Sequence, residues 1–162
     1  MGSFHIRLDY TYGLEVVKQN RLDFAYMGMA KELAKLSYAE RTKVGCLIVK
    51  DTQIISEGYN GTPKGFNNAC EYYSHVDEMY TKPEVLHAES NAISKIARST
   101  NSSSGSTLYV TLAPCFECAK LIIQSGVERV VYETSYRKNT GLALLKKAGV
   151  MCEELNDAEP KQ

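Results

Sequence analysis

Two short motifs constrain this chain more than any other feature. His87-Ala88-Glu89 begins one stretch with helical periodicity, and Pro114-Cys115-Phe116-Glu117-Cys118 begins a second one. Imidazole nitrogen and thiolate sulfur are common zinc ligands, and a catalytic zinc site keeps a fourth position open to water. We therefore predict that His87, Cys115 and Cys118 hold one catalytic zinc ion.

The two motifs also predict how the ligands meet. Cys115 and Cys118 are three positions apart, so their sulfur atoms project from the same face of a helix. Pro114 suits the entrance to that helix, where its missing N–H has no intrahelical partner. The positive end of a helix dipole favours thiolates. We expect two helix N-termini to converge, so that His87 lies beside both sulfurs.

Glu89 is predicted to be the catalytic proton carrier. It lies too close to His87 in sequence to be a natural fourth ligand. Zinc lowers the pKa of a bound water to about 7, and a nearby carboxylate then takes up the released proton. The pattern H-x-E followed by P-C-x-x-C is typical of zinc-dependent nucleobase deaminases, in which this glutamate is a general acid and base.

Composition excludes several other classes of protein. The 162 residues fit one domain, and a formal net charge of zero disfavours a nucleic-acid partner. Five cysteines, an odd number without framework spacing, fit a reducing compartment and a metal site. There is neither a long apolar run nor a signal-peptide pattern. We expect a cytoplasmic protein with a small-molecule substrate and no membrane partner.

Periodicity predicts alternating helices and strands. An apolar stripe over Arg21–Leu36 indicates a helix, with these residues facing a sheet: Leu22, Tyr26, Met29, Leu33 and Leu36. An antiparallel hairpin is predicted from strands at 44–49 and 53–59. The remaining elements are helices at 85–99, 115–124 and 139–147 and strands at 107–111, 127–133 and 150–154.

Two segments are interpreted without regular structure. Residues 1–20 have a mixed pattern and begin with Met-Gly-Ser, typical of a cloning remnant, so they are excluded from the fold prediction. Residues 67–84 are interpreted as a long polar loop of the kind that covers a binding site. Cys70 and His75 lie in it, and two ligands alone favour a hydrogen-bonded loop over a second metal site.

Four segments resemble the zinc-dependent deoxycytidylate (dCMP) deaminases, and the likeness runs from about Arg21 to Val150. The segments are Lys43-Val44-Gly45-Cys46-Leu47-Ile48-Val49, Gly58-Tyr59-Asn60-Gly61-Thr62-Pro63-Lys64-Gly65, His87-Ala88-Glu89-Ser90-Asn91-Ala92-Ile93 and Pro114-Cys115-Phe116-Glu117-Cys118-Ala119-Lys120. The resemblance implies a cytidine deaminase-like α/β fold, a three-layer α/β/α sandwich with a five-stranded mixed sheet. It places one deaminase domain at 21–155, after an N-terminal segment at 1–20 and before a polar tail at 156–162.

The resemblance also implies an activity. It is the hydrolytic deamination of dCMP to dUMP and ammonia by a zinc-bound hydroxide, which supplies dUMP for thymidylate synthesis. Family members are commonly homohexamers that dCTP activates and dTTP inhibits, with Mg²⁺ accompanying the effector. By position, Asn60 and Asn91 are expected to contact the deoxyribose or base, and Tyr136 and Arg137 to provide base stacking and a phosphate contact. The implied effector contacts are Gly58, Asn60, Gly61 and Lys64.

Alternatives remain at this point. One is a related zinc deaminase that acts on dCTP, cytidine or another amino-heterocycle. Another is a non-catalytic zinc-stabilised binding module, in which Glu89 only complements a helix dipole. Some family members also carry a second, structural zinc. Because Ala39 stands where one of its cysteines is expected and Cys70 matches only one ligand, we predict a single zinc.

Overall fold

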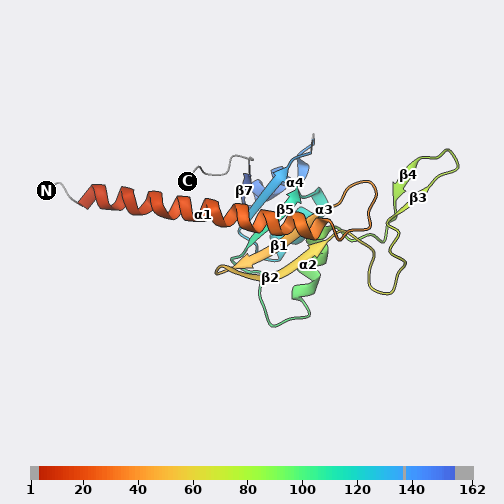
Figure 1. Cartoon of the computed structure of the whole chain (residues 1–162), viewed down its shortest axis with the longest axis horizontal. Coiled ribbons are helices and arrows are strands. Elements are labelled where there is room, and N and C mark those ends of the chain that lie inside the picture. Colours follow the sequence, from red (N-terminus) through yellow and green to blue (C-terminus); the bar gives the residue numbers. More distant parts are fainter. Residues whose placement is uncertain (1–3, 137, 156–162) are drawn as a thin grey trace.

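The structure is a computed structural model that describes residues 4–136 and 138–155 (Figure 1). Its helices and strands are, in chain order, α1 (Phe4–Ala34), β1 (Gly45–Lys50), β2 (Gln53–Tyr59), β3 (Glu71–Tyr73), β4 (Met79–Thr81), α2 (Ala88–Ile96), β5 (Thr107–Leu112), α3 (Phe116–Gln124), β6 (Arg129–Thr134), α4 (Thr140–Lys147) and β7 (Met151–Glu154). The tail at 156–162 lies outside the described residues. No helix in the described ranges is long and apolar enough to cross a membrane.

Five strands form one mixed sheet in the order β2-β1-β5-β6-β7. β1 is antiparallel to both β2 and β5, whereas β5, β6 and β7 run parallel to one another. The β1–β2 hairpin turns through Asp51 and Thr52, which both have positive φ. The predicted hairpin and five-stranded mixed sheet are confirmed.

Helices cover both faces of this sheet, which confirms the three-layer prediction. Successive residues of a strand point to opposite faces. Leu47 and Val49 of β1 accordingly pack in a cluster with residues of α1. Cys46 and Ile48 pack in the second cluster, with residues of α2, α3 and α4. Cys46 is thus a fully buried core residue, as its position in a strand predicts.

Helix α1 differs from the prediction in its start and in its buried face. It begins at Phe4, so residues 4–20 continue the helix predicted from Arg21, and its N-terminal half extends past the sheet (Figure 1). Met29 is 47% exposed, and Leu36 lies beyond the helix and is 55% exposed, so both predicted core positions were wrong. Met27 and Ala30 are buried instead.

The segment predicted as a loop at 67–84 contains a small hairpin. β3 and β4 pair antiparallel as a separate two-stranded sheet. The hairpin lies at the end of the molecule away from the N-terminus of α1 (Figure 1). Both strands are short and mostly exposed, so they carry little of the alternating pattern from which strands are predicted.

A buried polar cluster joins α1 to the sheet. Asp23 accepts two hydrogen bonds from the Arg129 guanidinium, at 2.9 and 2.6 Å, and one from the Tyr109 hydroxyl at 2.6 Å. Gln19 and Glu153 complete the cluster through Asp23 and Arg129. The cluster thereby links α1 to β5, β6 and β7.

Candidate functional site

His87 and Cys115 are the residues immediately before two helices, α2 and α3. Both have extended backbone angles, as residues at a helix N-cap do. The Cys115 sulfur accepts a hydrogen bond from the backbone N–H of Cys118 at 3.5 Å, so it caps the first turn of α3. The two helix N-termini converge as predicted.

The three predicted ligands form one compact group. His87 Nδ1 lies 3.5 Å from Cys115 Sγ and 3.4 Å from Cys118 Sγ. In a tetrahedral zinc site with Zn–S of about 2.3 Å and Zn–N of about 2.0 Å, the nitrogen and a sulfur are about 3.5 Å apart. The separations therefore fit zinc. Among the described residues this is the one group of three or more metal-ligating side chains within 4.8 Å of one another.

The protonation of the three groups is coupled. Hydrogen bonds with Cys118 and His87 lower the pKa of Cys115 to about 3. The bond to Cys115, together with burial, raises the pKa of Cys118. The bond to Cys115 also raises the pKa of His87, against the effect of burial. A divalent cation would favour the thiolate form of both cysteines, so zinc binding would release protons.

Glu89 lies in the first turn of α2 and is only 4% exposed. Burial raises the pKa of Glu89 to about 7, and the negative charge of Cys115 adds to this increase. The positive charge of His87 and hydrogen bonds with the backbone amide of Glu89 and with Cys118 oppose the increase. A carboxyl group that titrates near neutral pH both accepts and donates a proton readily. Its position and pKa suit a proton carrier beside the ligand group.

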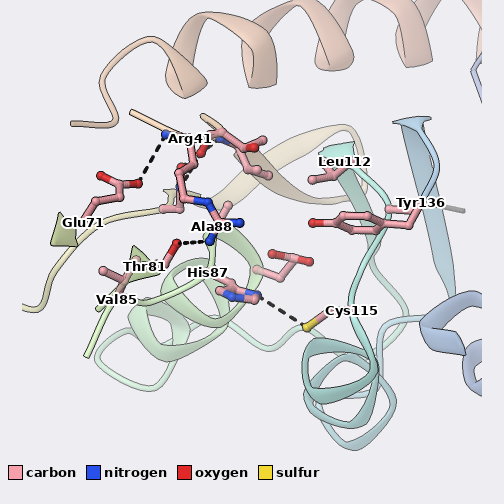
Figure 2. Close-up of a pocket in the computed structure, with 14 residues that line it drawn as sticks. Arg41, Glu71, Thr81, Val85, His87, Ala88, Leu112, Cys115 and Tyr136 are labelled. Atoms are coloured by element: carbon pink, nitrogen blue, oxygen red, sulfur yellow. Dashed lines mark hydrogen bonds between the residues drawn. The ribbon is translucent and has the colours of Figure 1, made fainter. Parts of the chain in front are cut away.

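His87, Glu89 and Cys115 line the floor of a pocket of about 410 Å³ (Figure 2). That volume is within the usual range of about 300–1,000 Å³ for small-molecule sites. The pocket is lined by Arg41, Thr42, Val44, Asn60, Glu71, Thr81, Val85, His87, Ala88, Glu89, Leu112, Ala113, Cys115 and Tyr136.

The two predicted asparagines lie in different places. Asn60 lines the pocket. Its side-chain amide also bonds the backbone of the loop before β1, where it accepts a hydrogen bond from the Val44 N–H and donates one to the Thr42 carbonyl, both at 2.8 Å. Asn91 is on α2 outside the pocket lining and donates to the Tyr59 carbonyl at 2.9 Å. Both amides hold the backbone around the pocket in place.

Tyr136 lines the pocket, and its ring points into the space above Cys115 (Figure 2). Burial raises the pKa of its hydroxyl, and the negative charges of Glu89, Cys115 and Cys118 add to this. The predicted neighbour, Arg137, lies outside the described residues.

The glycine-rich segment 58–65 begins within β2, and its first residue has a structural role. An added Cβ at Gly58 would lie 2.3 Å from the Ala88 carbonyl oxygen, so this glycine is required by the close packing of α2. Gly61 forms an isolated bridge with Leu86. Lys64 is exposed and does not line the pocket.

The sequence analysis did not identify Arg41, Glu71 and Thr81 as pocket residues. They lie on the loop before β1 and on the β3–β4 hairpin, both irregular in sequence pattern. No motif marks them, and only the fold brings these segments over the pocket. Cys70 is buried and its thiol bonds the Asn68 carbonyl, whereas His75 is exposed.

A three-ligand group that fits zinc, with a buried carboxylate beside it and a mixed sheet behind it, is the arrangement of the zinc-dependent deaminases. A family model described as the cytidine and deoxycytidylate deaminase zinc-binding region matches residues 20–134. The chain therefore belongs to the cytidine and deoxycytidylate deaminase family.

Known relatives are similar over most of the chain. The deoxycytidylate deaminase of Mycobacterium phage D29 is 38% identical, over 68% of this chain and 92% of that protein. The deoxycytidylate deaminase of Enterobacteria phage T4 is 36% identical, over 60% of this chain and 69% of that protein. The chain spans less of some other relatives, 42% of the deoxycytidylate deaminase of Schizosaccharomyces pombe and 46% of that of Saccharomyces cerevisiae.

A solved structure has the same fold. The crystal structure of the dCMP deaminase of cyanophage S-TIM5 in complex with dCMP and dUMP superposes with a TM-score of 0.77 at 41% sequence identity. The match covers 83% of this chain and 96% of that one. The fold prediction is confirmed by this comparison as well as by the topology of the sheet.

Proposed function

We propose that this chain catalyses the hydrolytic deamination of dCMP to dUMP and ammonia. The observation that carries the proposal is the convergence of His87, Cys115 and Cys118, with buried Glu89 beside them at the floor of the pocket. The choice of dCMP is supported by relatives named deoxycytidylate deaminase and by the similar phage enzyme that was solved with dCMP and dUMP.

Each residue has a defined part in this reaction. His87 Nδ1 and the two thiolates would hold one zinc ion, which would supply the Lewis acidity that makes water a nucleophile near neutral pH. Glu89 accepts a proton from the attacking water and delivers it to the ring nitrogen N3. Glu89 then takes the remaining proton from the new hydroxyl on C4 and transfers it to the amine, which leaves as ammonia when the bond between C4 and the exocyclic nitrogen breaks. The water oxygen remains on C4 as the new carbonyl.

The rest of the pocket binds the nucleotide in this proposal. Tyr136 is proposed to stack on the base, which is supported by the position of its ring in the pocket near Cys115. Asn60 and Asn91 are proposed to contact the deoxyribose or the base, and Arg137 to contact the phosphate. Arg137→Ala is expected to raise KM for dCMP and to spare turnover of deoxycytidine.

The family resemblance extends the proposal to regulation and setting. We propose a cytoplasmic homohexamer that supplies dUMP for thymidylate synthesis and is activated by dCTP and inhibited by dTTP, with Mg²⁺ on the effector. Effector contacts are proposed at Gly58, Asn60, Gly61 and Lys64. Light scattering of the purified protein and rate measurements with each effector test these statements separately from the chemistry.

The deciding experiment measures ammonia release from dCMP, dCTP, deoxycytidine and CMP side by side, with and without added dCTP. The proposal expects dCMP to have the highest kcat/KM and expects activity to disappear when the zinc is removed by a chelator and return when zinc is restored. Preference for dCTP or for an unphosphorylated substrate would contradict the choice of dCMP. Zinc-dependent folding without turnover of any amine would instead indicate a binding module.

A further inference from the structure

We propose that Arg41 is a specificity-determining residue that binds the phosphate of the nucleotide substrate; this inference rests on the proposed function. Arg41 lies on the loop between α1 and β1 and lines the pocket. Figure 2 shows it entering from the side of the pocket opposite to Cys115, with His87 between them. It is neither in a recognisable motif nor among the residues implied by family resemblance.

The charge of the pocket supports this role. Among the described residues that line it, Arg41 is the only lysine or arginine. A phosphate monoester carries a charge of about −1.5 to −2 at pH 7. Because Glu89 lies at the floor of the same pocket, an anion that enters it needs a cation at the entrance. The reacting base must reach His87 and Glu89, so the phosphate at the other end of the nucleotide lies toward the rim, where Arg41 is exposed.

The guanidinium retains donors for a ligand. One nitrogen, Nη1, donates to the Thr81 hydroxyl at 3.1 Å. Within the described ranges, the ion pairs do not include Arg41. A guanidinium has five N–H donors, so a single neutral bond leaves most of them for the paired hydrogen bonds that arginine makes to phosphate.

The β3–β4 hairpin holds Arg41 in this position. Glu71 of β3 accepts hydrogen bonds from the backbone N–H groups of Glu40 and Arg41, at 3.1 and 3.4 Å. The two bonds use different oxygens of Glu71, so its carboxylate is directed to the backbone of the loop and not to the guanidinium. Thr81 of β4 fixes the side chain. The hairpin thus acts as a support for the phosphate contact.

The test compares substrates with and without a phosphate. For Arg41→Ala, kcat/KM for dCMP is expected to fall about 30-fold or more, mainly through KM, because a charge-assisted hydrogen-bonded pair is lost. The value for deoxycytidine is expected to change less than about threefold. The kcat/KM of Arg41→Lys for dCMP should fall between the values of the wild type and Arg41→Ala, since lysine keeps the charge without the planar guanidinium. Lys43→Ala, an exposed cation two positions along and outside the pocket lining, is the matched control and should behave as wild type.

A second measurement does not depend on turnover. Calorimetry should show that Arg41→Ala weakens dUMP binding by a similar factor and leaves deoxyuridine binding unchanged, with the thermal midpoint confirming that the variant is folded. Thr81→Val removes the hydrogen bond that positions the Arg41 side chain but keeps its charge, so it should weaken dUMP binding only several-fold.

Two results would overturn the inference. One is that Arg41→Ala lowers kcat/KM equally for dCMP and deoxycytidine, or weakens the binding of dUMP and deoxyuridine equally. The other is a wild-type protein that binds dUMP no better than deoxyuridine. A wild-type protein that turns over neither dCMP nor deoxycytidine would refute the proposed function, and the binding data would still decide the role of Arg41.

Discussion

The two faces of the sheet each bury a carboxylate, and the two carboxylates behave in opposite ways. Asp23 on the α1 face is 2% exposed and Glu89 on the α2 face is 4% exposed, so burial alone does not distinguish them. Burial raises the pKa of both groups. For Asp23, however, hydrogen bonds from Arg129, Tyr109 and Gln19 and the charge of Arg129 outweigh burial, and its pKa is lowered.

The difference between them lies in their partners. Arg129 neutralises Asp23 with two hydrogen bonds, so Asp23 stays charged and serves to join α1 to the sheet. Glu89 is not part of an ion pair within the described ranges, and its pKa rises to about 7. A buried carboxylate with a cation partner is structural, whereas one without such a partner, next to metal ligands, is suited to carry protons.

The largest effect is expected from Glu89→Gln. Removal of a general acid and base that acts in more than one proton transfer should lower kcat for dCMP by about 10³-fold or more. Zinc content, measured by atomic emission, and the thermal midpoint should stay near the wild-type values, because the amide fills the same space. A variant that retains more than a tenth of wild-type activity would remove Glu89 from the mechanism.

The opposite pattern is expected from Asp23→Asn. Loss of the charge leaves Arg129 buried with an incomplete partner, and breaking a buried ion pair costs about 3–5 kcal/mol in free energy of unfolding. Urea denaturation measures this loss, while kcat of the folded protein should stay within about twofold of wild type, since Asp23 is on the other face of the sheet. Glu32→Gln, which breaks the exposed pair with Lys35, is the control and should leave stability unchanged within error.

The two carboxylates also differ in how far sequence alone predicts them. The motif around His87 and Cys115 identifies Glu89, because a metal site requires fixed residue types at fixed spacing. Asp23 lies in an ordinary helical pattern, and its partner Arg129 is far away in sequence, so only the fold shows that they meet. The same holds for Arg41, whose partner Thr81 is far away in sequence. Local pattern predicted the antiparallel hairpin and the family resemblance implied the five-stranded mixed sheet, whereas the order of the strands is known only from the structure.

The buried face of α1 was mispredicted for a related reason. Large apolar residues such as Met29 dominate a periodicity analysis, whereas Ala30 contributes little to it. Yet the helix approaches the sheet closely at Ala30, since an added Cβ at Gly45 would lie 1.9 Å from the Ala30 carbonyl oxygen. Close helix–sheet packing selects small residues, and these carry a weak hydrophobic signal.

Matched glycine substitutions separate the two faces further. Gly45→Ala would collide with Ala30 on α1, and Gly58→Ala with Ala88 on α2. Both should lower the free energy of unfolding by about 1–3 kcal/mol through overpacking. Only Gly58→Ala should also lower kcat/KM for dCMP, by about tenfold or more, because α2 begins at the catalytic group and small displacements there are costly. Equal activity losses in the two variants would show that the site is sensitive to either face.

The smallest effect concerns the pH dependence of stability. Because the folded-state pKa of Asp23 lies below its usual value, its contribution is fully present above about 3.9, the pKa of an unfolded aspartate, and is lost as the pH falls through the lower folded-state value. Acid also releases zinc from the cysteines, so wild type alone is not informative. The difference in unfolding free energy between wild type and Asp23→Asn cancels that shared effect. This difference should be constant from pH 7 to pH 5 and should shrink below about pH 4; if it persists unchanged into acid, the charge of Asp23 is not what joins α1 to the sheet.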